Sequence, residues 1–284
     1  MLHTCAMTNL KDIEKVAFEA SQKAATILRH YHEKKTFQTN FKGDVNLVTD
    51  ADLESEAAVI ETISKAFPDH AILSEENKDS HGESMEGPVW IIDPLDGTTN
   101  FSHGVPFFST SIAFRENAQT KVGLIYQPIL QELFVAHLGG GATLNGKKIS
   151  VSKGNTLTRS LLASGFPYDR RDSERNNLSE FCTLEMNSQD VRRPGAATLD
   201  LAYVACGRFD GYWEPKLSAW DVAAGMLLVT EAGGKITDYN GNPVVNLWNG
   251  EMVASNGIIH DSMIQLLQKA QEKLLPAKNF ATLL

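Results

Sequence analysis

The first part of the chain alternates between apolar and polar positions with a helical period. Over residues 9–33 the apolar side chains recur three or four positions apart, and a similar run extends from Thr49 or Asp50 to Phe67. This spacing places the apolar residues on one face of a helix, and a threonine or aspartate is typical of the residue that caps a helix N-terminus. The sequence therefore predicts two amphipathic helices, each covering a core with one face.

Shorter apolar runs predict a β-rich middle followed by mixed structure. The expected strands cover residues 71–73, 89–92, 107–115, 121–126, 132–138, 161–164, 235–238 and 252–254, and further helices are expected from about 197, over 220–230 and over 259–270. The dipeptide Asn145-Gly146 favours a hairpin turn. The glycines at 139–141 do not complete a dinucleotide-binding loop, and we interpret them as a turn.

Composition excludes some classes of protein. The chain has 284 residues, of which 42% are hydrophobic, which is ample for a core, and its net charge is −9. There is thus no excess of Lys and Arg to neutralise nucleic-acid phosphates, so we expect no nucleic-acid partner. An acidic protein that acts on an anionic ligand needs local positive charge, which bound cations supply.

The cellular location is predicted from missing signals. Residues 1–7 lack the basic and apolar regions of a signal peptide, and no window is long and apolar enough to span a membrane. The cysteines, Cys5, Cys182 and Cys206, have no zinc-like spacing, so free thiols in a reducing compartment are the default. We expect a cytoplasmic protein without a membrane partner.

The chemistry concentrates where the apolar run at 89–92 ends. Asp93 and Asp96 follow it, separated by Pro94 and Leu95, and Gly97 and two threonines come next. Carboxylate oxygens are hard ligands that suit Mg²⁺, proline stiffens the turn, and glycine lets the backbone approach an anion. A strand that ends in an ordinary acidic turn is the alternative, but the added Gly-Thr-Thr favours a site for cations and phosphate.

A second pair of acids follows the strand predicted at 71–73. Glu75 and Glu76 would be solvated at an isolated strand end. If this strand lies beside that at 89–92, the two strand ends meet at the same edge of a sheet, and their carboxylates converge. This is the first indication of a constellation of acids.

Two further acids have a simpler interpretation as well. Asp52 and Asp221 each fall in the first turn of a predicted helix, where a negative charge is favourable to the helix dipole. A buried carboxylate there would be costly without a cation. Both interpretations stay open for these residues.

Together, these motifs resemble the inositol monophosphatase family of magnesium-dependent, lithium-sensitive phosphatases. The segment from Trp90 to Phe101 is similar to the first family signature, and that from Trp220 to Gly234 is similar to the second. The acidic pair after Leu73, the element from Leu47 to Asp52 and the segment 195–202 also match. The resemblance runs from the first helix to the last strand.

The resemblance implies a fold and a domain organisation. It implies an α+β protein, a layered αβαβα sandwich of the sugar-phosphatase type. Residues 1–284 would form a single domain, in which an N-terminal half of about 1–150 packs against a C-terminal half of about 151–284. Relatives are usually dimers, so a homodimer is expected.

The resemblance also implies the ligands of two Mg²⁺ ions and the groups that activate water. The first ion would be held by Glu75, Asp93 and the Leu95 carbonyl, and the second by Asp93, Asp96 and Asp221. The catalytic residues would be Thr98, supported by Asp52, with Glu75 close by. Substrate contacts would come from Glu75, Leu95, Asp96, Gly97, Thr98, Gly195, Ala196, Ala197, Glu214 and Asp221.

The implied reaction is Mg²⁺-dependent hydrolysis of inositol 1-phosphate, or a similar small polyol phosphate, by an activated water. Fructose 1,6-bisphosphatase, histidinol phosphatase and 3′(2′),5′-bisphosphate nucleotidase activities are alternatives, because fold and metal chemistry are shared within the class. A regulatory binding protein that keeps the fold is the alternative from another class. Two residues differ from the family pattern at positions that affect substrate preference. Ala196 replaces an expected serine or threonine, and Lys216 lies where it can meet a second anionic group or solvent.

Overall fold

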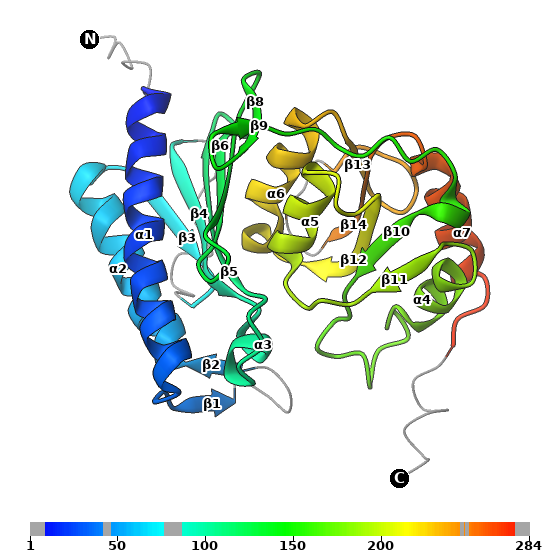
Figure 1. The fold of residues 1–284 in the computed structure, drawn as a ribbon, viewed down its shortest axis with the longest axis horizontal. Coiled ribbons are helices and arrows are strands. Elements are labelled where there is room, and N and C mark those ends of the chain that lie inside the picture. The colour runs from blue at the N-terminus through cyan, green and yellow to red at the C-terminus, as the bar shows by residue number, and fades with distance from the viewer. Residues whose placement is uncertain (1–8, 42–46, 77–86, 245–246, 248–249, 276–284) are drawn as a thin grey trace.

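The protein is organised in alternating layers of helix and sheet, as Figure 1 shows. Two helices cover one face of a seven-stranded sheet, two helices lie between this sheet and a five-stranded one, and two more cover the far side. The predicted αβαβα arrangement is therefore confirmed. The computed structural model describes residues 9–41, 47–76, 87–244, 247 and 250–275, so the expectation for residues 1–7, and Cys5, lie outside the described residues.

The outer layer of the N-terminal half consists of the two predicted amphipathic helices. They are α1 (Leu10–Lys34) and α2 (Asp50–Ala66). Their buried faces, which include Ile13 and Ile63, pack on the side chains of alternate strand residues such as Trp90 and Ile92. The side-chain period of two in a strand sends the neighbouring residue Ile91 to the opposite face, into the central core.

The larger sheet is built from consecutive strands. Its order is β3-β4-β5-β6-β7-β8-β9, in which only β3 and β4 are parallel neighbours. The bounds are β3 (Ala71–Ser74), β4 (Val89–Asp96), β5 (Ser109–Glu116), β6 (Gln119–Gln127), β7 (Glu132–His137), β8 (Gly141–Leu144) and β9 (Lys147–Lys148). The predicted hairpin turn joins β8 to β9, with Asn145 and Gly146 both at positive φ.

Strand β4 is longer than predicted. The apolar run ends at Ile92, but pairing with β5 continues to Asp96, with a register shift between Asp93 and Asp96. A proline has no N–H to donate to the ladder, and here Pro94 lies within that irregular stretch. The irregularity keeps both aspartates at the sheet's edge while the strand remains paired.

The central layer contains α5 (Ala197–Ala205) and α6 (Ala219–Glu231). Both helices are apolar nearly all round and are buried between the sheets. Close approach requires glycine at two points. A Cβ on Gly123 of β6 would lie 2.9 Å from the carbonyl oxygen of Ala224, and one on Gly225 would lie 2.5 Å from the side chain of Leu201.

The smaller sheet has the order β11-β10-β12-β14-β13. Its strands are β10 (Leu161–Ser164), β11 (Asp190–Arg192), β12 (Gly211–Leu217), β13 (Lys235–Thr237) and β14 (Gly250–Ser255). Its outer face is covered by α4 (Leu178–Glu185) and α7 (His260–Gln271). The sequence did not predict α4 or β11, which lie in a polar stretch without a clear period.

The remaining elements are short. They are β1 (Thr39–Phe41), β2 (Leu47–Thr49), α3 (Thr98–Ser102) and the 3-10 turn η2 (Leu157–Arg159). Strand β2 leads directly into α2, and α3 directly follows β4. The starts of α2 and α3 lie together, because the Thr98 hydroxyl donates to Asp52. None of the helices in the described ranges has the length and apolar character needed to cross a bilayer.

Candidate active site

The ends of β3 and β4 meet, as the sequence analysis required. The strands are parallel neighbours, and Ser74 stands opposite Ile92 in the register. Glu75 therefore leaves one strand at the level where Asp93 continues the other. The conditional prediction that these acids converge is confirmed.

Asp93 is buried among other acids. It is 1% exposed, and its Oδ1 accepts a hydrogen bond from the Leu95 N–H at 3.0 Å. Burial raises the pKa of Asp93 well above its ordinary value, and the negative charges of Glu75, Asp96 and Asp221 raise it further. A buried carboxylate with acidic neighbours is stabilised by a cation, whose charge offsets both penalties.

Asp96 joins the two halves of the protein. Its Oδ2 accepts hydrogen bonds from the Thr198 N–H at 2.8 Å and from the Thr198 hydroxyl, at the start of α5. The same hydroxyl lies 2.7 Å from Ser109 of β5. Burial raises the pKa of Asp96 to about 6, although hydrogen bonds from Thr198, Ala197 and Gly97 oppose the shift.

Asp221 lies in the first turn of α6, and both interpretations that the sequence left open apply to it. Its Oδ2 accepts a hydrogen bond from the Ser218 N–H at 2.7 Å, which completes a capping box. Burial raises the pKa of Asp221, as do the charges of Glu75 and Asp96. The carboxylate thus caps a helix and still faces the other acids.

Asp52 has the same double role at the start of α2. Its Oδ2 accepts from the N–H of Thr49 at 2.8 Å and from the Thr49 hydroxyl at 2.6 Å, closing a capping box. Its other oxygen, Oδ1, is 3.0 Å from the hydroxyl of Thr98, which also lies 3.1 Å from the Leu95 carbonyl oxygen. Burial raises the pKa of Asp52 to about 6, against the hydrogen bonds from the two threonines.

Gly97 makes the turn between β4 and α3. Its φ of +93° is costly for a residue with a side chain, and a Cβ there would lie 2.9 Å from the Phe107 carbonyl oxygen. The turn is tied to the other half through Asn100, whose Nδ2 donates to the Pro194 carbonyl at 2.8 Å. Glycine is thus required here by backbone conformation and by packing.

A cavity of about 840 Å³ opens beside these groups. Asp96, Gly97 and Asp221 line it together with Glu214 of β12 and the segment 195–197. Burial raises the pKa of Glu214 to about 7, and its Oε2 accepts a hydrogen bond from the Tyr212 hydroxyl at 2.6 Å. The volume falls in the range of pockets that enclose small organic ligands.

Known proteins with the same arrangement identify the family. Residues 9–272 match the model of the inositol monophosphatase family. The chain is 47% identical over 222 residues to an inositol-1-monophosphatase of Synechocystis, covering 78% of this chain and 77% of that protein. The chain belongs to the inositol monophosphatase family.

Two further members of the family extend the comparison. A protein of Pasteurella multocida named Nus factor SuhB is 41% identical over 254 residues, covering 89% of this chain and 94% of that one. The solved structure of the inositol monophosphatase from Anabaena superposes with a TM-score of 0.82 at 43% identity, covering 95% of this chain and 98% of that one. The family fold that the sequence predicted is therefore confirmed.

The donor set of this family member fits a magnesium ion. Within the part of the chain that the structure describes, no group of three or more His, Cys, Asp or Glu side chains is arranged to hold a metal ion. Mg²⁺ does not need a complete protein cage, because it keeps several waters and takes further ligands from substrate phosphate oxygens. The mutually repelling carboxylates at Asp93, Asp96 and Asp221, of which the first two are buried, are the hard oxygen donors that it prefers.

Most of the predicted site residues come together. Ala197, predicted to contact substrate, lines the cavity, and its N–H donates to Asp96. The Lys216 ammonium donates to Asp169 and, at 2.7 Å, to Ser173, so it anchors the loop after β10. Lys216 also lines the cavity, so its contact with a second anionic group stays a prediction.

Sequence reasoning missed two residues at this site. Thr198 bridges Asp96 and Ser109, and its position in the first turn of a predicted helix was the available signal. Tyr168 lines the cavity, and its pKa is raised by partial desolvation and by the negative charges of Glu75, Asp221, Asp96 and Asp93. Its loop carries no pattern that distinguishes it from a surface turn.

Proposed function

We propose that this protein is a Mg²⁺-dependent phosphomonoesterase that hydrolyses inositol 1-phosphate to inositol and phosphate. The observation that carries the proposal is the meeting of Asp93, Asp96 and Asp221 with the hydrogen-bonded pair Thr98–Asp52. Relatives named inositol-1-monophosphatase support the choice of substrate.

The metal ligands are proposed from chemistry and family resemblance together. Glu75, Asp93 and the Leu95 carbonyl would hold one ion, and Asp93, Asp96 and Asp221 a second. When bound, Mg²⁺ neutralises phosphate charge and lowers the pKa of water. Li⁺ inhibition by competition at one of these positions is part of the proposal.

The chain's own groups position the attacking water and the ester. The Thr98 hydroxyl donates to Oδ1 of Asp52, which leaves an oxygen lone pair to accept a proton from water. The N–H of Thr98 would face the phosphate oxygens, where a fixed dipole stabilises developing charge, while the N–H of Gly97 donates to Asp96 and holds that carboxylate in place. Glu214 accepts from substrate hydroxyls, because among the described residues only Tyr212 donates to it.

Phosphate release from inositol 1-phosphate tests the proposal. The assay compares it with fructose 1,6-bisphosphate, histidinol phosphate and 3′-phosphoadenosine 5′-phosphate, each with Mg²⁺ and with EDTA. Fast release from the inositol ester that needs Mg²⁺ is the expected result. Faster release from another ester would support the same metal-dependent hydrolysis but assign a different substrate. Inactivity towards all four would favour a binding role, and relatives named Nus factor SuhB make a regulatory partner the next candidate.

We also propose that the protein is a cytoplasmic homodimer. The location is supported by the free thiols of Cys182 and Cys206, which are the default in a reducing compartment, and the dimer by the family resemblance. Sedimentation of the purified protein at micromolar concentration tests the dimer, and a monomer at all concentrations would reject it.

A further inference from the structure

Thr198, near the start of α5, holds the carboxylate of Asp96 in place. Its hydroxyl and its N–H both donate to Asp96 Oδ2, the N–H at 2.8 Å. Thr198 has no exposed surface, whereas Asp96 is 9% exposed and lines the cavity. Two donors on one buried residue therefore fix the orientation of a carboxylate that faces the cavity.

The direction of each hydrogen bond follows from the chemistry of the three side chains involved. An ionised carboxylate only accepts, so the Thr198 hydroxyl donates its one hydrogen to Asp96. Ser109 Oγ, which is fully buried and 2.7 Å from Thr198 Oγ1, must then be the donor to Thr198. Ser109 also stands opposite Asp96 in the register of β4 and β5. A chain of hydrogen bonds thus runs from β5 through α5 to the end of β4.

Asp96 in turn supplies the cap that α5 lacks. The first N–H groups of a helix have no partner within the helix, and Ala196, the N-cap residue of α5, has no side chain that could accept from them. Asp96 accepts from the N–H groups of Ala197 and Thr198 instead. A serine or threonine at position 196 would compete for such an N–H. With alanine there, the N–H of Thr198 is left to Asp96.

The other acids of the site do not depend on a distant hydroxyl in this way. Asp93 and Asp221 accept from backbone N–H groups two and three residues away in the chain. The donor to Asp96 lies 102 residues away, in the other half of the protein. Removal of the Thr198 hydroxyl therefore acts on Asp96 and leaves these hydrogen bonds of Asp93 and Asp221 in place.

We propose that Thr198 is a positioning residue for Mg²⁺, whose hydroxyl raises the affinity of the protein for the cation by fixing the carboxylate of Asp96. The inference rests on the proposed function, because it takes Asp96 to be a ligand of the cation. Thr198 itself touches neither the cation nor the substrate. Side chains that orient a metal ligand contribute to metal affinity, and loss of one typically costs roughly 10- to 100-fold.

Calorimetric titration of the substrate-free protein with Mg²⁺ tests the inference without using turnover. Thr198→Val removes the hydroxyl but keeps the N–H and a similar volume, so it should weaken Mg²⁺ binding by roughly tenfold, the lower end of that range. Thr198→Ser keeps the hydroxyl and should bind Mg²⁺ as the parent does. Ser109→Ala should fall between the parent and Thr198→Val, because the Thr198 hydroxyl still donates to Asp96 but is no longer oriented by its own donor.

Thr62→Val is the matched control. Thr62 is a buried threonine of α2 whose hydroxyl donates to the Ala58 carbonyl at 2.7 Å, and it does not line the cavity. Its replacement should leave Mg²⁺ affinity unchanged, whatever it does to Tm. Unchanged Mg²⁺ affinity in Thr198→Val, with or without a lower Tm, would mean that the residue has only a structural role and would overturn the inference. If Thr198→Val does not fold, unchanged affinity in Ser109→Ala would overturn it instead.

The Mg²⁺ dependence of phosphate release gives a second readout. In Thr198→Val the Mg²⁺ concentration for half-maximal activity should rise by the same factor as the dissociation constant, and saturating Mg²⁺ should restore kcat. A loss of kcat that excess Mg²⁺ does not restore, together with unchanged binding, would contradict a role in Mg²⁺ affinity.

The two readouts also separate this inference from the proposed function. A parent protein that binds Mg²⁺ but hydrolyses no ester would refute the phosphatase activity, and weaker binding by Thr198→Val would still support the positioning role. A parent protein that binds no Mg²⁺ would refute the metal site and this inference with it.

Discussion

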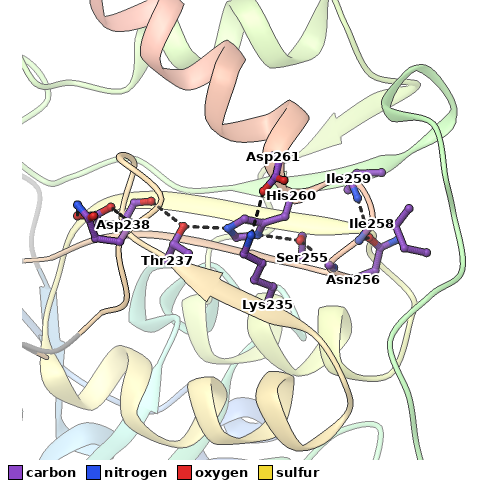
Figure 2. Close-up of polar contacts among 11 residues, drawn as sticks. Lys235, Thr237, Asp238, Ser255, Asn256, Ile258, Ile259, His260 and Asp261 are labelled. Carbon is purple, nitrogen blue, oxygen red and sulfur yellow. Dashed lines mark hydrogen bonds and ion pairs between the residues drawn. The ribbon is translucent and has the colours of Figure 1, made fainter.

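Protonation of a buried histidine should make the protein less stable in mild acid. His260, the first residue of α7, has no exposed surface, and its ring lies between two hydroxyls, as Figure 2 shows. Its Nε2 is 2.8 Å from Thr237 Oγ1 and its Nδ1 is 2.9 Å from Ser255 Oγ. The donor and acceptor roles of these two hydroxyls determine the protonation state of the imidazole ring.

The hydrogen bonds fit the neutral ring with the proton on Nε2. Thr237 donates its hydrogen to the Asp238 carbonyl at 2.7 Å, so it accepts from Nε2. Ser255 accepts from the Gly257 N–H at 3.0 Å, and it donates its own hydrogen to Nδ1. A second proton on Nδ1 would displace that donor. The nearby ion pair of Lys235 and Asp261 places one positive and one negative charge beside the ring, and these act on the pKa of His260 in opposite directions.

The expected magnitude follows from the shifted pKa. Burial lowers the pKa of His260 to about 4, with a further contribution from the charge of Lys235 and an opposing one from Asp261. The unfolded chain, with a histidine pKa of about 6.5, takes up a proton before the native state does, so stability is complete above pH 6.5 and falls towards pH 4. Between pH 7 and pH 5 the loss from this residue is about 2 kcal/mol, or roughly 3 to 4 °C in Tm.

Urea unfolding of the parent and of His260→Gln at both pH values measures this term. Glutamine does not titrate, and its amide keeps a donor for Thr237. All other titrating groups are common to the two proteins, so the difference in their unfolding free energies isolates His260. That difference should shrink by about 2 kcal/mol from pH 7 to pH 5. A difference that does not change with pH would refute the reasoning, as would an NMR titration of the ring near pH 6.5.

Three further outcomes are expected. Asp93→Asn should abolish Mg²⁺-dependent phosphate release without lowering Tm, because it removes a buried charge repelled by its neighbours; near-normal turnover would contradict the proposed ligands. Thr98→Val should lower kcat by about 10²- to 10⁴-fold with little change in KM, since the hydroxyl shared with Asp52 is lost, and an unchanged kcat would exclude that role. Gly123→Ala should destabilise by about 1–3 kcal/mol in urea unfolding, because its Cβ meets the Ala224 backbone, and unchanged stability would mean that α6 can move away.

Local patterns predicted the elements that have a strong period. The helices α1 and α2 follow from their helical period, the strands β3 to β7 follow from short apolar runs, and α6 follows from its apolar run, whereas the sequence indicated only the turn between β8 and β9. The predicted end of β4 came too early. Pro94 favours a break after the apolar run, but the strand continues past it to Asp96 through an irregular stretch. The helix α4 was missed because most of its contacts are with α7, which is far away in sequence.

The acids of the site were predictable and their partners were not. Asp93 and Asp96 stand out because a buried strand leads directly to them. Nothing local indicates that Asp96 bonds Thr198, more than a hundred residues away, or that Arg170 turns towards the cavity. Such contacts arise when two sheets pack through a shared helical layer, which is a property of the whole fold.

The shared layer has a consequence for how the protein can be divided. Helices α5 and α6 follow the smaller sheet's first strand in sequence, yet they cover the inner face of the larger sheet. A fragment that ends in the connection after β9 would expose that apolar face, and the remainder would expose α5 and α6, so each fragment is complementary to the other. A cut between residues 149 and 156 should thus give two inactive pieces that reassemble on mixing, and recovered catalysis would report their association.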